Sequence, residues 1–267
     1  MKKKKSRLDQ LLVERGLYPD LKTAQGFILA GKVVVDEQVV STPGTAVAHT
    51  AEVLLRERLE RYASRGGLKL EAAIHRFGLD FRDRVVLDAG ASTGGFTDCA
   101  LQHGAKRVYA VDVGFGQLRG KLASDPRVES RERTNVSDLT AASFDPPIER
   151  AVFDLSYLSI TKSAPIVAAL FVPPAAVDMV GLIKPLYEGV PQEDKAGLQA
   201  IQAALVRIFD SLDGSGLEVR ALIPSPILGG KGAIELLAWI GGGGRSDRAL
   251  IPQAIAEAAQ SFVNVAT

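Results

Sequence analysis

The chain alternates short apolar runs with amphipathic segments, and this pattern predicts an α/β domain over most of its length. The apolar runs end in polar or small residues, as strands do when both faces of a sheet are buried. The expected strands are residues 85–87, 107–113, 128–134, 150–154, 177–183, 218–223 and 233–240, and the expected helices include 68–77, 97–103, 196–212 and 252–263. Such alternation predicts a doubly wound α/β fold, a mostly parallel seven-stranded sheet with helices on both faces.

The first 60 residues follow a different pattern. Two amphipathic helices are expected at 7–15 and 20–30, and short strands at 32–35, 39–40 and 52–55, with a turn at 36–38. This predicts a small α+β domain over residues 1–60 and a larger domain over 61–267, with a charged linker at 56–65. A unit of about 55 residues is too small to bury a secure core easily by itself.

Charge divides unevenly between these parts, although the chain as a whole carries only +1. Residues 1–70 hold 13 Lys and Arg against 8 Asp and Glu, a balance of +5, which leaves 19 against 23, or −4, for the remainder. A basic first part suggests a polyanionic partner such as nucleic acid. A solvated charged face is the alternative.

A glycine-rich loop, D-A-G-A-S-T-G-G-F at residues 88–96, follows the strand at 85–87. It lacks the G-x-G-x-x-G spacing of a dinucleotide fingerprint. Its D-x-G-x-x-x-G-G pattern resembles the S-adenosyl-L-methionine (SAM) loop of Rossmann-like methyltransferases, while a structural glycine turn or another nucleotide are alternatives. The candidate cofactor contacts are Asp88, Gly90, Ser92, Thr93, Gly94, Gly95 and Phe96. Asp88 either reaches the cofactor through water or supports the loop.

Two further polar residues are expected near the same ligand. Asp112 ends the strand at 107–113, where a carboxylate can accept hydrogen bonds from ribose hydroxyls. A surface loop acid is the alternative for Asp112. Asn135 and Asp138 follow the next strand, at positions where such folds usually contact adenine.

The N-terminal pattern resembles the S-four-like RNA-binding domain, named after a ribosomal protein. The matching stretches are S-R-L-D-Q-L-L-V-E-R-G-L, L-K-T-A-Q-G-F-I-L-A-G-K-V-V-V-D and S-T-P-G-T-A-V. The resemblance implies RNA recognition, largely by shape, with Arg7, Lys22 and Lys32 as candidate backbone contacts. In the linker, Arg58, Arg61 and Arg65 either extend this basic track or belong to a solvated segment.

Four ionisable residues, Lys69, Asp154, Lys184 and Glu235, are expected at strand ends or at a helix start. Each alone is weak evidence, but together with the loop they resemble the tetrad of FtsJ-like RNA ribose 2′-O-methyltransferases. A ribose hydroxyl is a poor nucleophile that must be oriented and lose its proton during methyl transfer. We assign Lys184 as base or hydroxyl-orienting group, Asp154 as its positioner, and Lys69 and Glu235 as supports.

The combined motifs resemble the TlyA family of rRNA methyltransferases, also called hemolysin A. They are S-R-G-G-L-K-L-E-A-A, D-A-G-A-S-T-G-G-F-T-D, Y-A-V-D-V-G-F-G-Q-L, F-D-L-S-Y-L-S-I, L-I-K-P and G-A-I-E. The resemblance implies SAM-dependent 2′-O-methylation of ribosomal RNA in ribosomal subunits, usually at cytidine, and a cytoplasmic enzyme. Two departures are Ala233, where the family commonly has Asn, and K-P-L-Y-E at 184–188 in place of K-P-Q-F-E.

Other readings follow from the same residues. Apolar runs of about 18 residues are lacking, so a spanning helix is not expected, and the basic N-terminus leads into a broken apolar segment that does not predict export. Cys99 fits a packed helix position better than a nucleophile, and His49, His75 and His103 show no metal-ligand spacing, so no metal is expected. The rival functions are a membrane-active hemolysin, a non-catalytic RNA-binding assembly factor and a base methyltransferase.

Overall fold

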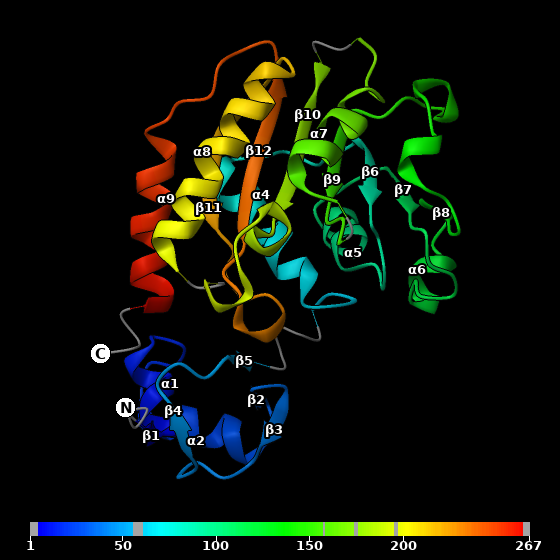
Figure 1. Cartoon of the computed structure of the whole chain (residues 1–267). Coiled ribbons are helices and arrows are strands. Elements are labelled where there is room, and N and C mark those ends of the chain that lie inside the picture. The colour runs from blue at the N-terminus through cyan, green and yellow to red at the C-terminus, as the bar shows by residue number, and fades with distance from the viewer. Residues whose placement is uncertain (1–4, 56–60, 157, 174–175, 195–196, 264–267) are drawn as a thin grey trace. The chain divides into compact units, whose positions relative to one another are not determined.

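The computed structural model describes residues 5–55, 61–156, 158–173, 176–194 and 197–263 (Figure 1). The chain divides into two compact units. The larger unit runs from Tyr62 to Glu257, and the smaller one comprises the residues before it together with those from Ala258 onward.

The smaller unit packs two helices on short strands. Its elements are β1 (Lys5–Arg7), α1 (Leu8–Glu14), α2 (Leu21–Leu29), β2 (Val33–Val35), β3 (Gln38–Val40), β4 (Ala46–Ala48) and β5 (Val53–Leu55). Both partners of β2, the strands β3 and β5, run antiparallel to it, and β1 pairs with β4. The apolar stripe of α1 (Leu8, Leu11 and Leu12) forms the core with Ile28 and Val33. Both helices and three strands were predicted, while β1 and β4 were missed.

The larger unit is built on a seven-stranded sheet. Its strands are β6 (Val85–Ala89), β7 (Arg107–Val111), β8 (Val128–Arg131), β9 (Arg150–Phe153), β10 (Asp178–Ile183), β11 (Leu217–Pro224) and β12 (Leu236–Gly242), in the order β11-β12-β10-β9-β6-β7-β8. Neighbours from β10 to β8 are parallel, whereas β12 runs antiparallel to both β10 and β11. The mostly parallel seven-stranded sheet is therefore confirmed.

Helices cover both faces of this sheet, as Figure 1 shows. They are α4 (Gly66–Phe77), α5 (Gly95–Gln102), α6 (Gly120–Ala123), α7 (Ile160–Ala168), α8 (Leu198–Gly214) and α9 (Leu250–Ala258). Helices α4 and α5 bury their apolar faces on side chains such as Val152, Val180 and Leu182. A Cβ at Gly181, one residue from both Val180 and Leu182, would contact Ile160 of α7, so α7 packs on the opposite face. The sheet is thus buried on both sides.

Both ends of the last predicted strand, residues 233–240, were wrong. Glu235 was expected inside a strand, but β12 begins one residue later, after a 3-10 turn at Gly230–Gly232. The same strand was expected to end at residue 240, yet Gly241 and Gly242 belong to β12 and pair with β11. Pairing with neighbouring strands satisfies their backbone groups, which outweighs the weak strand propensity of glycine.

Candidate functional site

The four candidate tetrad residues form two ion pairs. Lys184 pairs with Asp154, and Nζ of Lys69 lies 2.6 Å from Oε2 of Glu235. The Lys69–Glu235 pair is buried, with 10% of the lysine side chain and 7% of the glutamate side chain exposed. A buried ammonium and a buried carboxylate are each costly alone, so the two compensate one another.

The sheet register explains why these residues meet. Leu182 and Leu237 are partners in the antiparallel ladder of β10 and β12, and side chains two residues apart on a strand share a face. Continuing this register past Ile183 and Leu236 pairs Lys184 with Glu235, on the same face of the sheet as Leu182 and Leu237. The parallel register of β9 and β10, continued by one residue, sets Asp154 beside Leu182. All of these positions lie at one edge of the sheet.

Lys69 reaches the same face from the helix that covers it. It lies in the first turn of α4, where the helix dipole disfavours a cation, and Glu235 supplies the compensating charge. The loop before β12 fits closely around that carboxylate, because a Cβ at Gly229 would come within 2.2 Å of Oε1 of Glu235. Glycine is the residue that permits this approach.

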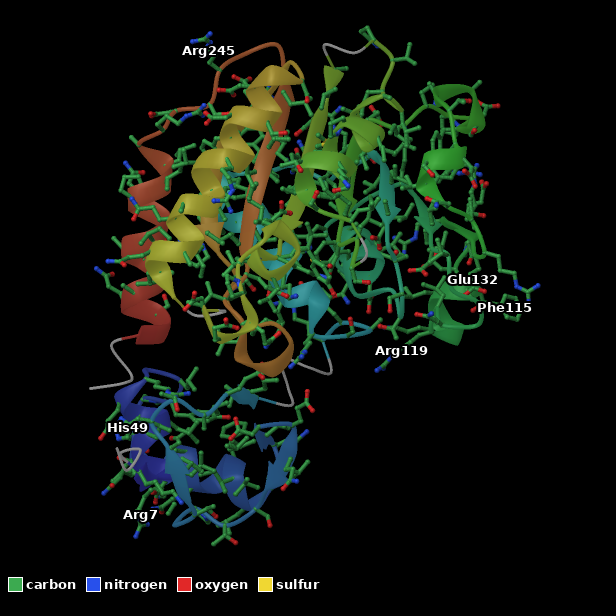
Figure 2. The ribbon with its side chains drawn as sticks, viewed as in Figure 1. Arg7, His49, Phe115, Arg119, Glu132 and Arg245 are labelled. Carbon is green, nitrogen blue, oxygen red and sulfur yellow. The ribbon has the colours of Figure 1, made fainter. Side chains whose placement is uncertain are left out.

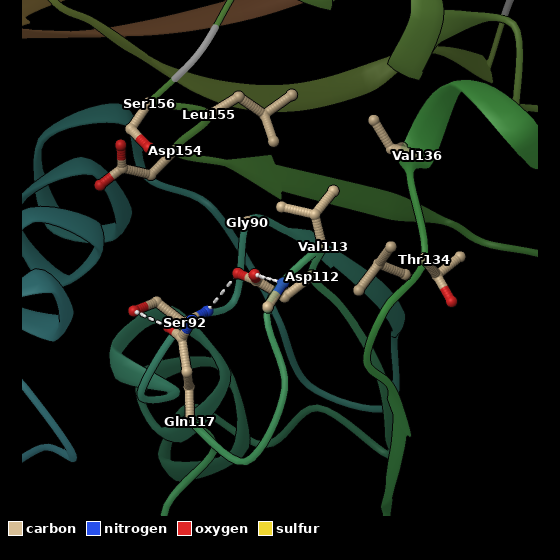
Figure 3. A pocket seen from close by; sticks show the side chains of 12 residues that line it. Gly90, Ser92, Asp112, Val113, Gln117, Thr134, Val136, Asp154, Leu155 and Ser156 are labelled. Carbon is tan, nitrogen blue, oxygen red and sulfur yellow. Dashed lines mark hydrogen bonds between the residues drawn. The ribbon is translucent and has the colours of Figure 1, made fainter.

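A cavity of about 290 Å³ lies at the carboxyl ends of β6, β7 and β9 and continues into the segment after β8 (Figure 3). Its volume is near the lower end of small-molecule sites, about 300–1,000 Å³. It is lined by Gly90, Ser92, Val111, Asp112, Val113, Gly114, Gln117, Thr134, Val136, Asp154, Leu155 and Ser156. Asp154 thus belongs both to the cavity wall and to the ion pair with Lys184.

Asp112 organises the wall of this cavity. One carboxylate oxygen accepts from the backbone N–H of Ser92 at 2.8 Å and the other from that of Gly114 at 2.7 Å (Figure 3). A carboxylate has about four acceptor sites, so capacity for ligand hydroxyls remains. Gly90 has a φ of 86°, and a Cβ there would lie 2.6 Å from the carbonyl oxygen of Asp154. The close approach of the loop to β9 therefore requires glycine.

Several other cofactor candidates do not line the cavity. A Cβ at Gly94 would meet Leu122 at 2.4 Å, and one at Gly95 would meet Ser64 at 2.3 Å, so both glycines serve packing within the protein. Thr93 precedes them, and Phe96 is a buried residue of α5. Asn135 accepts a hydrogen bond from the backbone of Ser137 at 3.1 Å, while its neighbours Thr134 and Val136 line the wall.

Asp88 is fully buried beneath the loop. Its Oδ2 accepts a hydrogen bond from Thr97 of α5 at 2.6 Å, and its Oδ1 has no hydrogen-bond partner among the described residues. Burial raises the pKa of Asp88 to about 7, helped by the negative charges of Asp154 and Asp112 and opposed by the Thr97 hydrogen bond. This carboxyl joins β6 to α5, and Asp88 is not among the residues that line the cavity.

The sequence did not single out much of the cavity wall. Val113, Gly114 and Gln117 follow β7, and Leu155 and Ser156 follow Asp154. All five are uncharged and so carried no chemical signature of their own, although they lie within the quoted motifs Y-A-V-D-V-G-F-G-Q-L and F-D-L-S-Y-L-S-I. Their place directly after predicted strands was the available signal, because ligands of such folds bind at the carboxyl ends of the strands.

The candidate RNA contacts are spread over both units. Lys22 is exposed in the first turn of α2, and Lys32 is partly exposed before β2. Arg7, labelled in Figure 2, donates to both carboxylate oxygens of the buried Asp9, at 3.0 and 2.7 Å. Arg61 is exposed and Arg65 partly buried. Arg58 lies outside the described residues.

A seven-stranded sheet with one antiparallel strand, and a loop and cavity at the carboxyl ends of its parallel strands, define a Rossmann-like methyltransferase. The chain belongs to the FtsJ-like methyltransferases, whose family model matches residues 62–197. An S4 domain matches residues 6–53.

Relatives similar to nearly the whole chain carry related names. "Putative rRNA methyltransferase YqxC" of Bacillus subtilis is 41% identical over 91% of this chain and 89% of its own. The "16S/23S rRNA (cytidine-2'-O)-methyltransferase TlyA" of Mycobacterium tuberculosis is 34% identical over 98% of both chains. A solved structure, "Putative hemolysin from Streptococcus thermophilus", is 35% identical with a TM-score of 0.73 and covers 97% of this chain and 98% of its own.

Of the helices in the described part of the chain, none is both long enough and apolar enough to cross a bilayer.

Proposed function

We propose that this methyltransferase transfers the methyl group of SAM to the ribose 2′-hydroxyl of a nucleotide, usually a cytidine, in ribosomal RNA. The FtsJ-like domain, the S4 domain and relatives named as rRNA methyltransferases support the proposal. The observation that supports this proposal most strongly is that Asp154 both lines the cavity and pairs with Lys184. A donor in the cavity and an acceptor at the lysine would then be adjacent.

The cavity residues suit an adenosine-bearing donor. Asp112 offers carboxylate oxygens for ribose hydroxyls, and Val111 and Val136 provide apolar surface for a base. Bound SAM supplies an electrophilic methyl group on a sulfonium. The carboxylate of Asp154 lies at the boundary between the cavity and Lys184, where it can stabilise positive charge.

The two ion pairs orient the acceptor. Lys184 Nζ has three donor positions, so it can hold Asp154 and the 2′-oxygen together. The hydroxyl proton must leave as the methyl group passes from sulfur to that oxygen, and Lys184 either orients the hydroxyl or takes up this proton as the base. Lys69 and Glu235 act as positioning residues, because their buried pair fixes the sheet edge next to Lys184.

The N-terminal unit supplies RNA affinity. Lys22 and Lys32 give it exposed or partly exposed positive charge, and phosphate contacts from such residues position RNA without reading its sequence. The target nucleotide is then selected by which ribose the bound ribosomal RNA presents to Lys184.

The test is methyl transfer from labelled SAM to separated ribosomal subunits, with the modified nucleotide mapped. We expect a ribose-methylated product, and Lys184→Ala should reduce the rate by at least about 100-fold, the lower range of proton-transfer contributions. Lys106→Ala is the matched control, because Lys106 is half exposed and pairs with Glu149 at 3.7 Å, just before β7 and away from the carboxyl ends. Its rate should equal that of the wild type.

The same experiment, with RNA binding and liposome leakage measured alongside it, distinguishes the rival functions. A product methylated on the base, or an unaffected Lys184→Ala variant, would contradict the proposed chemistry. Tight RNA binding without methyl transfer would favour an assembly factor. Liposome leakage that survives Lys184→Ala, in the absence of methyl transfer, would favour a membrane-active protein.

A further inference from the structure

Helices α4 and α5 bring together three side chains of types that can bind a metal ion. Glu71 and His75 lie one turn apart on α4, and His103 is the C-cap residue of α5. Each residue offers one ligand atom, and these three atoms all lie within 4.8 Å of one another. Lys69, in contrast, lies in the first turn of α4, so this group is separate from the tetrad.

The hydrogen bonding of His103 prepares one ring nitrogen for a metal. Its Nδ1–H donates to the backbone carbonyl of Cys99 at 2.8 Å, and a neutral imidazole protonated there has its lone pair on Nε2. Metal-binding histidines commonly hold their ring in this way, through a hydrogen bond from the other nitrogen. The thiol of Cys99 is buried and lies 3.6 Å from Nδ1, on the hydrogen-bonded side of the ring.

The remaining contacts also suit a cation. His75 Nε2 lies 3.9 Å from Oε1 of Glu71, and the rings of His75 and His103 meet edge to face with centroids 5.9 Å apart. The carboxyl ends of helices favour positive charge. Arg76, the neighbouring cation on α4, donates hydrogen bonds to both carboxylate oxygens of Glu257, at 2.5 and 3.0 Å.

We infer that Glu71, His75 and His103 bind a divalent transition-metal ion such as Zn²⁺. Two imidazoles and one carboxylate suit Zn²⁺ better than Mg²⁺ or Ca²⁺, which prefer oxygen ligands. Tetrahedral bonds of about 2.0–2.1 Å require ligand atoms roughly 3.4 Å apart, and the exposed His75 side chain can rotate to close the gap. Solvent completes the coordination.

The bound ion would join α4 to α5. These two helices also carry Lys69 and Thr97, which contact Glu235 and Asp88 near the candidate site. The histidine spacing along the chain gave no sign of such a site, because the three ligands come from two helices that meet only in the folded protein.

Isothermal titration calorimetry with ZnCl₂ on the full-length, tag-free protein tests the inference. We expect one Zn²⁺ per chain, with affinity reduced at least about 10-fold in His75→Ala and in His103→Gln, since even outer-shell changes cost 10–100-fold. His49→Ala is the matched control, because His49 belongs to the N-terminal unit (Figure 2). It should bind Zn²⁺ as the wild type does.

Thermal unfolding of the same proteins gives a second readout. Zn²⁺ should raise the unfolding midpoint of the wild type and of His49→Ala, but not of His75→Ala, because ligands that bind only the folded state stabilise it. His75 is exposed, so this variant decides the question even if the His103 variant fails to fold. Absence of Zn²⁺ binding, or binding that survives His75→Ala or requires His49, would overturn the inference.

Discussion

Asp88 shows how one buried carboxyl links the fold to pH. Its pKa of about 7 exceeds the usual value for aspartate because burial penalises the charged form. The folded state therefore holds a proton that the unfolded chain releases near pH 4. By linkage, this group makes the protein less stable as pH rises from about 4 to about 7, after which its effect is constant.

Asp88→Asn should remove this dependence, since asparagine has nearly the same shape and its oxygen can still accept from Thr97. Relative to the wild type, the variant should gain stability between pH 4 and 7 and keep that gain above pH 7. Three pKa units correspond to at most about 4 kcal/mol. Urea denaturation of both proteins across this pH range measures the difference. Curves that stay parallel would show that Asp88 does not titrate there.

Asp9 illustrates the opposite case, a buried carboxyl whose pKa is lowered because it pairs with a cation, Arg7. The hydrogen bond from Arg7 holds the pKa of Asp9 at about 2, against the effect of burial. That ion pair contributes stability at neutral pH, and the contribution is lost as pH falls from about 4 towards 2. Substituting Arg7 would therefore disturb folding as well as RNA binding, so Lys22 and Lys32 are better probes of the RNA surface.

Helix α4 depends on close packing at its start. Gly67 lies in its first turn, and an added Cβ would be 2.4 Å from Cγ of the buried Tyr62 ring. We expect Gly67→Ala to destabilise the protein by about 1–3 kcal/mol, as overpacking does, and to slow methyl transfer by displacing Lys69. Chemical denaturation and the methylation assay measure the two effects.

Gly214→Ala is the matched control for this packing. Gly214 is the last residue of α8, and an added Cβ would meet no atom of the described residues within 4 Å. Because alanine has the higher helix propensity, this variant should be unchanged or more stable, by up to about 1 kcal/mol. Equal effects of the two substitutions would mean that contact with Tyr62 does not limit the position of α4.

Strand ends were more predictable than helix contacts. The apolar runs before Asp154 and Lys184 predicted both residues at the carboxyl edge of the sheet, because parallel strands end together. Lys69 and Glu235 were assigned as supports through family resemblance, but their pairing with each other was not predicted, since it depends on how α4 packs on the sheet. Three-residue strands such as β1 and β4 carry too few side chains to give a pattern. Glu235 was misplaced because the apolar run around it continues across the strand boundary.

The basic N-terminal unit should determine how the whole enzyme responds to salt. Each phosphate contact releases counterions, so the logarithm of RNA affinity should fall by about 0.7–0.9 per logarithmic unit of salt for every contact. If Lys22 and Lys32 each neutralise a phosphate, the double variant Lys22→Ala/Lys32→Ala should lower this slope by about 1.4–1.8. Binding of a ribosomal RNA transcript at several salt concentrations measures it.

The control removes the same amount of charge elsewhere. Arg82 and Arg127 are exposed in the larger unit, and each already donates to a neighbouring carboxylate, of Asp80 and Asp125. Their double alanine variant should keep the wild-type slope, because these charges are locally neutralised. If both double variants lowered the slope equally, the salt dependence of RNA affinity would reflect the net charge of the protein alone. If the lysine variant matched the wild type, these two lysines would not contact the RNA backbone.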